Sequence, residues 1–162
     1  MAEEESLITE EMRSRVGVES ASWTLEVDKT TVRMFARSCQ YTDPVFFDEA
    51  FAKSKGYRSL PAPPHYLGTP IFNPVTSDPT FGGARGGGPR GNPKLKRVLN
   101  GGTDIEYFDT IQAGDVLTAS SKVAEIVERA GSLGPMVITT TETTYKRDGT
   151  VVAISRGTGI AY

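Results

Sequence analysis

Few side chains in this sequence could carry acid–base or metal chemistry, because its 162 residues include one histidine, His65, and one cysteine, Cys39. A zinc site built from several Cys and His ligands is therefore excluded, as are an internal disulfide and a Cys-x-x-Cys redox pair. Any imidazole-based acid–base chemistry must use His65 or a histidine of another chain. We expect no metal and no other cofactor.

A glycine-rich loop over residues 77–96 is the second feature that could bind a ligand. It contains Arg85, Arg90 and Lys94. The loop could wrap an anion such as a nucleotide phosphate, or it could be a solvated, flexible loop. It is not a P-loop, because no Gly-Lys-Ser/Thr ending precedes a helix.

The overall composition narrows the possible partners. The chain has 18 Lys and Arg against 20 Asp and Glu, so it has no basic field that would hold nucleic acid. No apolar stretch approaches the roughly 20 residues that span a membrane. Residues 1–5 form an acidic tail, unlike a targeting signal. We expect a soluble cytoplasmic protein.

The first half of the chain has helical patterns. Short helices are predicted over residues 6–15 and from Asp48 to Gly56, and a strand over 23–27. Asp28 is a suitable N-cap for a further helix. Its predicted buried face has apolar residues at helical spacing, which are Val32, Phe35, Ala36 and Cys39. We expect Cys39 to be a small core residue on this face.

The second half is rich in Val, Ile, Thr and Tyr, as strands are. Antiparallel strands need a cover for their apolar face, and the helices of the first half can supply it. We therefore predict one α+β domain over residues 1–162. The predicted strands are 98–99 with 103–108, 115–128, 136–146 and 150–162, with a turn at 147–149.

Several short motifs occur in an order and spacing that is similar to a known family. They are Val32–Ala36, Asp43–Asp48, Gly56-Tyr57, Ala62–Pro64, Leu99–Gly102, and the strand pair 105–108 and 111–117. With them the chain resembles the MaoC-like hydratase and dehydratase family, in its MaoC amino-terminal dehydratase branch. The resemblance implies a single hot-dog fold, an antiparallel sheet wrapped around a helix, which pairs into a double hot-dog.

The resemblance also implies a chemistry, from which this chain departs. Family members that add water to enoyl thioesters have the signature Asp-x-Asn-Pro-Ile/Leu-His, whose Asp and His activate the water. If Asp43-Pro44 replaces Asn-Pro, these two positions are Tyr41 and Phe46. A phenylalanine has no proton to exchange, and a phenol with an ordinary pKa near ~10 is a poor general base.

Relatives with this loss pair with a chain that keeps the Asp and His. We therefore expect an acyl-CoA-binding or acyl-carrier-protein-binding subunit of a heteromeric enoyl-CoA hydratase or 3-hydroxyacyl-CoA dehydratase, acting on fatty-acyl or bulkier steroid side-chain groups. Its partner would be a MaoC-like catalytic subunit, with a homodimer as the alternative. Other possibilities are a self-sufficient hydratase, a non-enzymatic acyl-CoA scaffold, and a thioesterase that uses Asp43, Asp48 or Glu49.

Other polar residues are candidates for the site, each with a structural alternative. His65 and Asp43 are weak catalytic candidates, and either could instead belong to the scaffold as a hydrogen-bonded imidazole or a turn cap. The candidate substrate-binding residues are His65, Tyr66, Asn100, Gly101, Arg85, Arg90 and Lys94.

Overall fold

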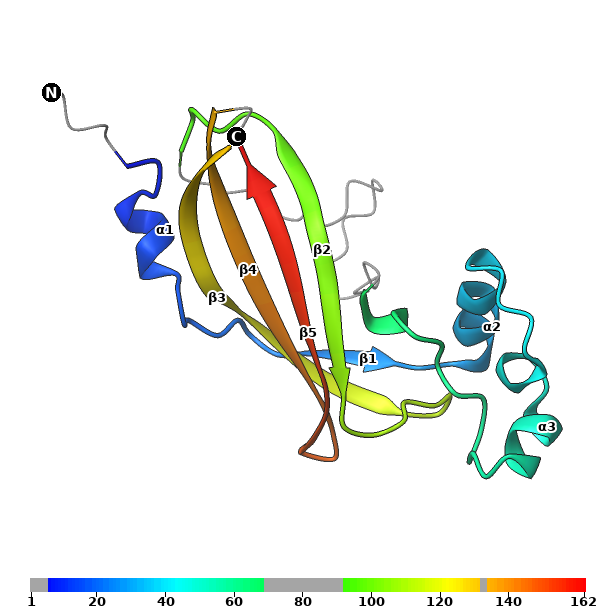
Figure 1. Ribbon diagram of the computed structural model, residues 1–162. Helices are drawn as coiled ribbons and strands as arrows, with labels where there is room; N and C mark the ends of the chain where they lie inside the picture. The colour runs from blue at the N-terminus through cyan, green and yellow to red at the C-terminus, as the bar shows by residue number, and fades with distance from the viewer. Residues whose placement is uncertain (1–5, 69–91, 132–133) are drawn as a thin grey trace, which may run out of the picture.

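The fold is an antiparallel five-stranded sheet with helices at its two ends (Figure 1). The computed structural model describes residues 6–68, 92–131 and 134–162. In the sheet order β1-β3-β4-β5-β2, the first two strands of the sequence form the two edges. The predicted α+β architecture is confirmed. The elements are α1 (Glu10–Ser14), β1 (Trp23–Glu26), α2 (Lys29–Ser38), η1 (Pro44–Phe46), α3 (Glu49–Ser54), η2 (Tyr66–Gly68), β2 (Val98–Tyr107), β3 (Val116–Gly131), β4 (Gly134–Arg147) and β5 (Thr150–Ala161).

The predicted turn at 147–149 closes the hairpin between β4 and β5. Arg147 pairs with Thr150, which leaves two residues in the turn. Asp148 has φ 51° and Gly149 has φ 82°. Two positive φ values in succession define a type I′ turn, which matches the twist of the strands and favours Asp-Gly.

The predicted helix after Asp28 is α2, and its first turn is capped as expected. The Asp28 carboxylate accepts hydrogen bonds from the backbone N–H groups of Thr30 at 2.8 Å and Thr31 at 3.0 Å. Val32 and Ala36 are completely buried, so the predicted inner face is confirmed for them. The prediction for Cys39 is wrong, since this residue is exposed. Because α2 ends at Ser38, Cys39 caps the helix and lies beyond its buried stripe.

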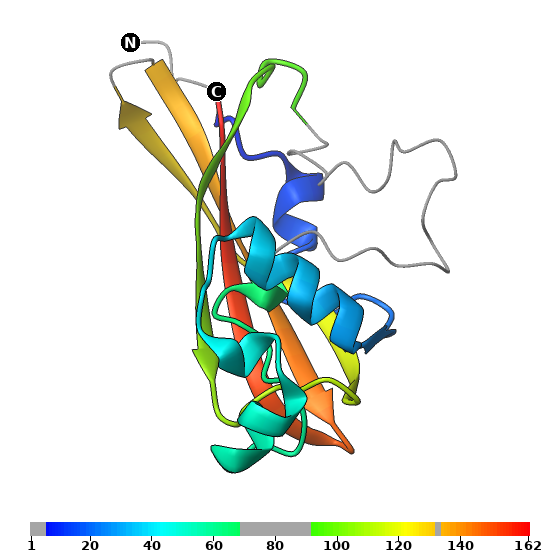
Figure 2. The same ribbon diagram turned by 90° about the vertical axis from the view of Figure 1, so that its right-hand side faces the viewer.

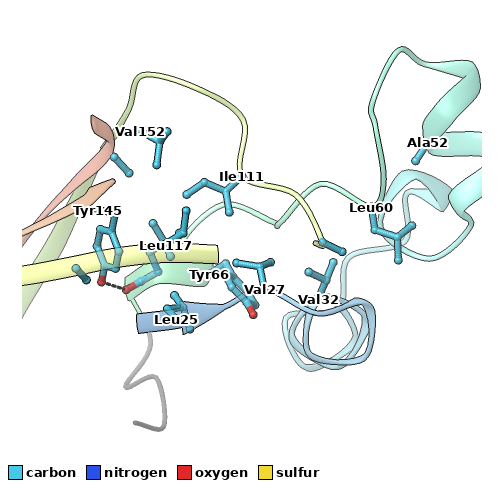
Figure 3. Packing of buried hydrophobic residues seen from close by; sticks show 14 of the residues in the cluster. Leu25, Val27, Val32, Ala52, Leu60, Tyr66, Ile111, Leu117, Tyr145 and Val152 are labelled. Atoms are coloured by element: carbon cyan, nitrogen blue, oxygen red, sulfur yellow. Dashed lines mark hydrogen bonds between the residues drawn. The ribbon is translucent and has the colours of Figure 1, made fainter. Parts of the chain in front are cut away.

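The main core lies between the sheet and the segments around α2 and α3 (Figure 3). Leu60, Leu117 and Val32 are among its largest fully buried side chains. α1 lies away from α2 and α3, beside a different stretch of the sheet (Figures 1 and 2). There Leu7 and Met12 form a smaller cluster with Val137.

Candidate functional site

A tight turn after α2 positions Tyr41. Gln40, with φ 59°, ends the helix in the left-handed conformation. The Tyr41 N–H then donates to the Ala36 carbonyl at 2.9 Å. Asp43 caps η1, because its carboxylate accepts from the Val45 N–H at 2.9 Å. This hydrogen bond supports the capping alternative for Asp43, and its catalytic role stays a prediction.

Tyr41 and Phe46, which the sequence comparison predicts to stand at the Asp and His positions of the signature, are in ring contact. Their ring centroids are 5.3 Å apart and their planes are tilted by 56°. Phe46 is half-buried and packs against the main core. This aromatic pair offers one hydroxyl and no imidazole.

The proline-rich loop 61–68 lies against the segment before β3. Pro61 bridges to Gln112, and the Ala62 N–H donates to the Ile111 carbonyl at 2.8 Å. His65 is exposed and has φ 65°. A left-handed conformation is costly for a residue with a Cβ atom and is found where the surrounding structure enforces it. The backbone of His65 is therefore held in one conformation, while its imidazole faces solvent.

Tyr66 points into the core. Its hydroxyl lies 2.8 Å from Thr31 Oγ1, and its ring meets Phe35 edge-on with centroids 5.6 Å apart. Burial raises the pKa of Tyr66, against the opposing effect of the Thr31 hydrogen bond. The hydroxyl therefore stays protonated near neutral pH. Its contacts are those of a residue that fastens the loop to α2, and its predicted role in substrate binding stays a prediction.

Two tyrosines that the sequence did not single out face this loop from the sheet. The pairing register aligns Tyr145 of β4 with Ala153 of β5, and Ala153 with Tyr107 of β2. Tyr145 and Tyr107 therefore stand on one face of the sheet with a small residue between them. The Tyr145 hydroxyl donates to the Leu67 carbonyl at 3.2 Å (Figure 3). Burial is the main cause that raises the pKa of Tyr145 to about 12, and the nearby Tyr107 adds to it.

Tyr107 brings the separate segments of the site together. Burial is the main cause that raises its pKa, and Tyr41 raises it further. Backbone groups of Leu67 and His65 next to the hydroxyl act in the opposite direction. The Tyr107 hydroxyl therefore lies next to the backbone of His65 and Leu67 and near Tyr41, and because it stays protonated at neutral pH it can donate a hydrogen bond to a carbonyl oxygen.

Asn100 and Gly101 lie farther along β2, at a β-bulge. The Asn100 side chain accepts from the Gly102 N–H at 2.9 Å. A Cβ atom on Gly101 would approach Thr158 Cγ2 to 2.9 Å, so a larger residue would not fit without a shift of β5. The close approach at Gly101 is therefore to β5, within the sheet, and the predicted role of Asn100 and Gly101 in substrate binding stays a prediction.

A cavity of about 750 Å³ opens between the sheet and the segment around α1. Hydroxyl-bearing and small residues form its wall along β4 and β5, and the remaining wall combines apolar side chains with charged ones such as Arg15, Glu19 and Lys122. Asn100 is part of this wall, whereas Tyr41, His65 and Tyr107 are not. Representative lining residues are Met12, Ile126, Thr139, Thr141, Gly157 and Gly159.

The carboxylates required by a thioesterase are engaged in other interactions. Asp48 caps α3 by accepting from the N–H groups of Ala50 at 2.8 Å and Phe51 at 3.1 Å. Glu49 forms ion pairs with Lys29 and Lys53, which lower its pKa to about 2. These interactions disfavour the use of either carboxylate as a general base.

A buried carboxylate, Asp115, ties together the segments that lead into loop 61–68 and β3. It binds Arg58 at 2.7 Å and Arg147 at 3.0 Å and accepts from the Gln112 N–H at 2.9 Å. Burial pushes the pKa of Asp115 upward, but these hydrogen bonds outweigh burial and lower it. Arg147 also pairs with Asp109. The network is a structural clamp at the end of the sheet.

Part of the predicted ligand-binding loop is not described. Arg85 and Arg90 lie outside the described residues, as does the acidic tail 1–5. The structure describes the end of this loop from residue 92 onward, where the Lys94 backbone N–H donates to the Asn92 side chain at 2.9 Å. Among residues 6–68, 92–131 and 134–162, no group of three His, Cys, Asp or Glu side chains is placed to hold a metal ion. No helix in these ranges is long and apolar enough to cross a membrane.

Comparisons with known proteins agree with this architecture. The family described as FAS1-like, dehydratase domain region, matches residues 14–155. A UPF0336 protein of Streptomyces avermitilis is 30% identical over 110 residues, which cover 66% of this chain and 67% of that protein.

Solved structures with the same fold include dehydratases. A MaoC-like dehydratase matches with a TM-score of 0.72 at 23% identity, over 92% of this chain and 42% of that longer chain. A chain of the ChsH1-ChsH2 complex from Mycobacterium tuberculosis matches with a TM-score of 0.67 at 16% identity, over 89% of this chain and 84% of that one. At these identities the likeness shows the fold, which is the hot-dog fold.

Proposed function

Since the chain belongs to the FAS1-like dehydratase region family, we propose that it is an acyl-thioester-binding subunit of an enoyl-thioester hydratase or 3-hydroxyacyl-thioester dehydratase. In this proposal the acid and the base of the reaction come from another chain. The observation that carries it is the ring contact of Tyr41 and Phe46, which stands where the signature has Asp and His.

The chemistry explains why this substitution matters. Hydration adds the oxygen of water to C3 of the enoyl group and a proton to C2, while one proton of the water is removed. A base must accept that proton, and an acid must supply the other. Phe46 can do neither, and the Tyr107 phenol is held in its protonated form. A neutral phenol is suited to a different task, which is to donate a hydrogen bond to the thioester carbonyl.

A complex of two different components supports the proposal that two chains share the reaction. This is the ChsH1-ChsH2 complex, one chain of which has the same fold as the chain described here. By analogy, the chain described here would shape the acyl-binding side of the site and a related chain would supply the Asp and His. The cavity between β4, β5 and α1, about 750 Å³, offers space for an acyl group.

Co-expression tests the proposal. The chain should be produced with a MaoC-like chain that keeps Asp-x-Asn-Pro-x-His, and the hydration of crotonyl-CoA should be measured for each chain and for the pair. We expect activity that depends on both chains, and almost none from this chain alone. The matched control is the same pair with the partner's signature Asp changed to Asn, which should be inactive.

Three results would contradict the proposal and point to the alternatives. Robust hydration by the purified chain alone would show a self-sufficient hydratase with a different acid and base. Binding of crotonyl-CoA without turnover in any pairing would favour a non-enzymatic acyl-CoA scaffold. Release of free CoA would favour a thioesterase, and Asp43→Asn should then abolish it.

A further inference from the structure

The N-terminal segment over residues 6–20 covers the cavity between the sheet and α1. This cavity of about 750 Å³ is lined by residues of β2, β3, β4 and β5, and its other lining residues in the described part of the chain all belong to the N-terminal segment. They are Met12, Arg15, Val18, Glu19 and Ser20. Thr139 and Thr141 line the cavity from β4, so the segment forms the wall that faces the sheet.

The C-terminal end of this segment is attached to β3 by its backbone. The Gly17 N–H donates to the Val123 carbonyl at 2.8 Å. The Ser20 N–H donates to the Ser121 carbonyl at 2.7 Å. The chain between α1 and β1 thus runs along β3 and is held by hydrogen bonds of the kind that join the strands of the sheet (Figure 1).

The N-terminal end is attached by two side chains that both bind Leu7. Glu128 of β3 accepts hydrogen bonds from the Leu7 N–H at 3.1 Å and from the Ser6 hydroxyl at 3.0 Å. The Asn92 side-chain amide donates to the Leu7 carbonyl at 2.8 Å. The Leu7 side chain is buried. These contacts of Ser6, Leu7, Asn92 and Glu128 form a latch that fixes this end of the segment to the sheet.

Gly17 lies between α1 and the part that is bonded to β3, and it can act as a hinge. Its φ is 80°, a left-handed conformation that favours glycine, and no described atom lies within 4 Å of the position that a Cβ atom would take. α1 has only five residues, and a helix of this length is not stable without its neighbours. Release of the latch therefore frees residues 6–15 from the sheet, while the backbone bonds to β3 hold the rest.

We infer that residues 6–15 are a strap that opens at the latch, turns at Gly17 and closes over an acyl chain in the cavity. The strap carries Met12, which is 2% exposed and lines the cavity. An unbranched methionine side chain can repack against ligands of different shape. An acyl chain that contacts Met12 only when the strap is closed shifts the strap toward the closed position. The strap deepens the proposed function, on which it depends for the nature of the ligand, by adding the route into the cavity.

A cross-link across the latch tests this route on the full chain. The variant carries Ser6→Cys and Glu128→Cys, with Cys39→Ser to remove the exposed native thiol, and a short bis-maleimide reagent joins the two introduced thiols. The probe is cis-parinaric acid, a fluorescent long-chain fatty acid, and stopped-flow fluorescence gives its association and dissociation rates. Before cross-linking, the loss of the latch should raise both rates at least about fivefold above those of the Cys39→Ser protein. After cross-linking, both rates should fall at least about tenfold below those of the Cys39→Ser protein, because the strap cannot open.

Hydrogen exchange measured by mass spectrometry locates the motion. Glu128→Ala should raise the exchange rate of the amides in residues 6–15 about fivefold, because opening of the strap becomes more frequent. The matched control is Glu125→Ala on the same strand, since Glu125 has no hydrogen bond or ion pair to the strap in the described part of the chain. This control should leave the exchange rate unchanged. Bound cis-parinaric acid should slow the exchange of residues 6–15 in the wild type.

The opposite results overturn the inference. A cross-linked protein, folded by circular dichroism, that takes up the probe as fast as the Cys39→Ser protein would show that the ligand enters elsewhere. Equal exchange rates in Glu128→Ala and Glu125→Ala would remove Glu128 from the latch. A wild type that binds no cis-parinaric acid, or binds it without slower exchange in residues 6–15, would also overturn the inference, whatever rate of hydration the co-expression experiment gives. These measurements use this chain without a catalytic partner, so their failure is separate from that of the proposed function.

Discussion

Replacing Asp115 with asparagine should lower the free energy of unfolding by about 2–4 kcal/mol. The carboxylate is 2% exposed and accepts hydrogen bonds from Arg58 at 2.7 Å, Arg147 at 3.0 Å and the Gln112 N–H at 2.9 Å. The asparagine side chain would keep the shape, but it would lose the charge, and its NH₂ group would face either Arg58 in place of Oδ1 or both the Gln112 N–H and Arg147 in place of Oδ2. The loss of the charge together with at least one of these hydrogen bonds accounts for the cost.

The effect of this substitution should also depend on pH. The folded-state pKa of Asp115 is lowered from 3.8, so its ionised form stabilises the fold above that value and this contribution is lost as the pH falls through the folded-state pKa. The difference in unfolding free energy between wild type and Asp115→Asn should therefore be full near pH 7 and should narrow in acid below about pH 4.

Urea denaturation followed by circular dichroism at several pH values provides the measurement. The matched control is Asp109→Asn, which removes another carboxylate bound to Arg147. Because the Asp109 side chain is 56% exposed, its loss should cost less than about 1 kcal/mol. Equal costs for Asp109→Asn and Asp115→Asn, or a cost for Asp115→Asn that does not change in acid, would refute the argument that the buried carboxylate is the centre of the clamp.

Two further substitutions test the site and the capping of α2. Tyr107→Phe should weaken crotonyl-CoA binding about 2- to 10-fold in calorimetry, because one hydrogen bond to the thioester is lost; unchanged affinity in a folded variant would remove Tyr107 from the site. Asp28→Ala should lower the unfolding free energy by about 1 kcal/mol, because the N-cap bonds to Thr30 and Thr31 are lost. Asp28→Ser should recover most of that loss in the same denaturation assay, and a serine variant as unstable as the alanine variant would contradict the capping argument.

Local features were predictable where neighbouring residues decide the conformation. The N-cap at Asp28 and the turn at Asp148-Gly149 depend on hydrogen bonds and φ values within a few residues, and both are confirmed. The burial of Val32 and Ala36 follows from helical spacing. Cys39 shows the limit of that pattern, because spacing alone does not give the residue at which the helix ends.

The sequence alone determined that the chain has one imidazole, and it led to the prediction that Tyr41 and Phe46 replace the Asp and His of the family signature. It also indicated an α+β chain with long strands, because alternation and turn residues act locally. Only the tertiary structure placed Tyr107 beside Tyr41 and the His65 backbone, and only the strand order made β2 an edge. These features depend on which strands pair and in which register, and that choice is set by contacts between residues far apart in the chain.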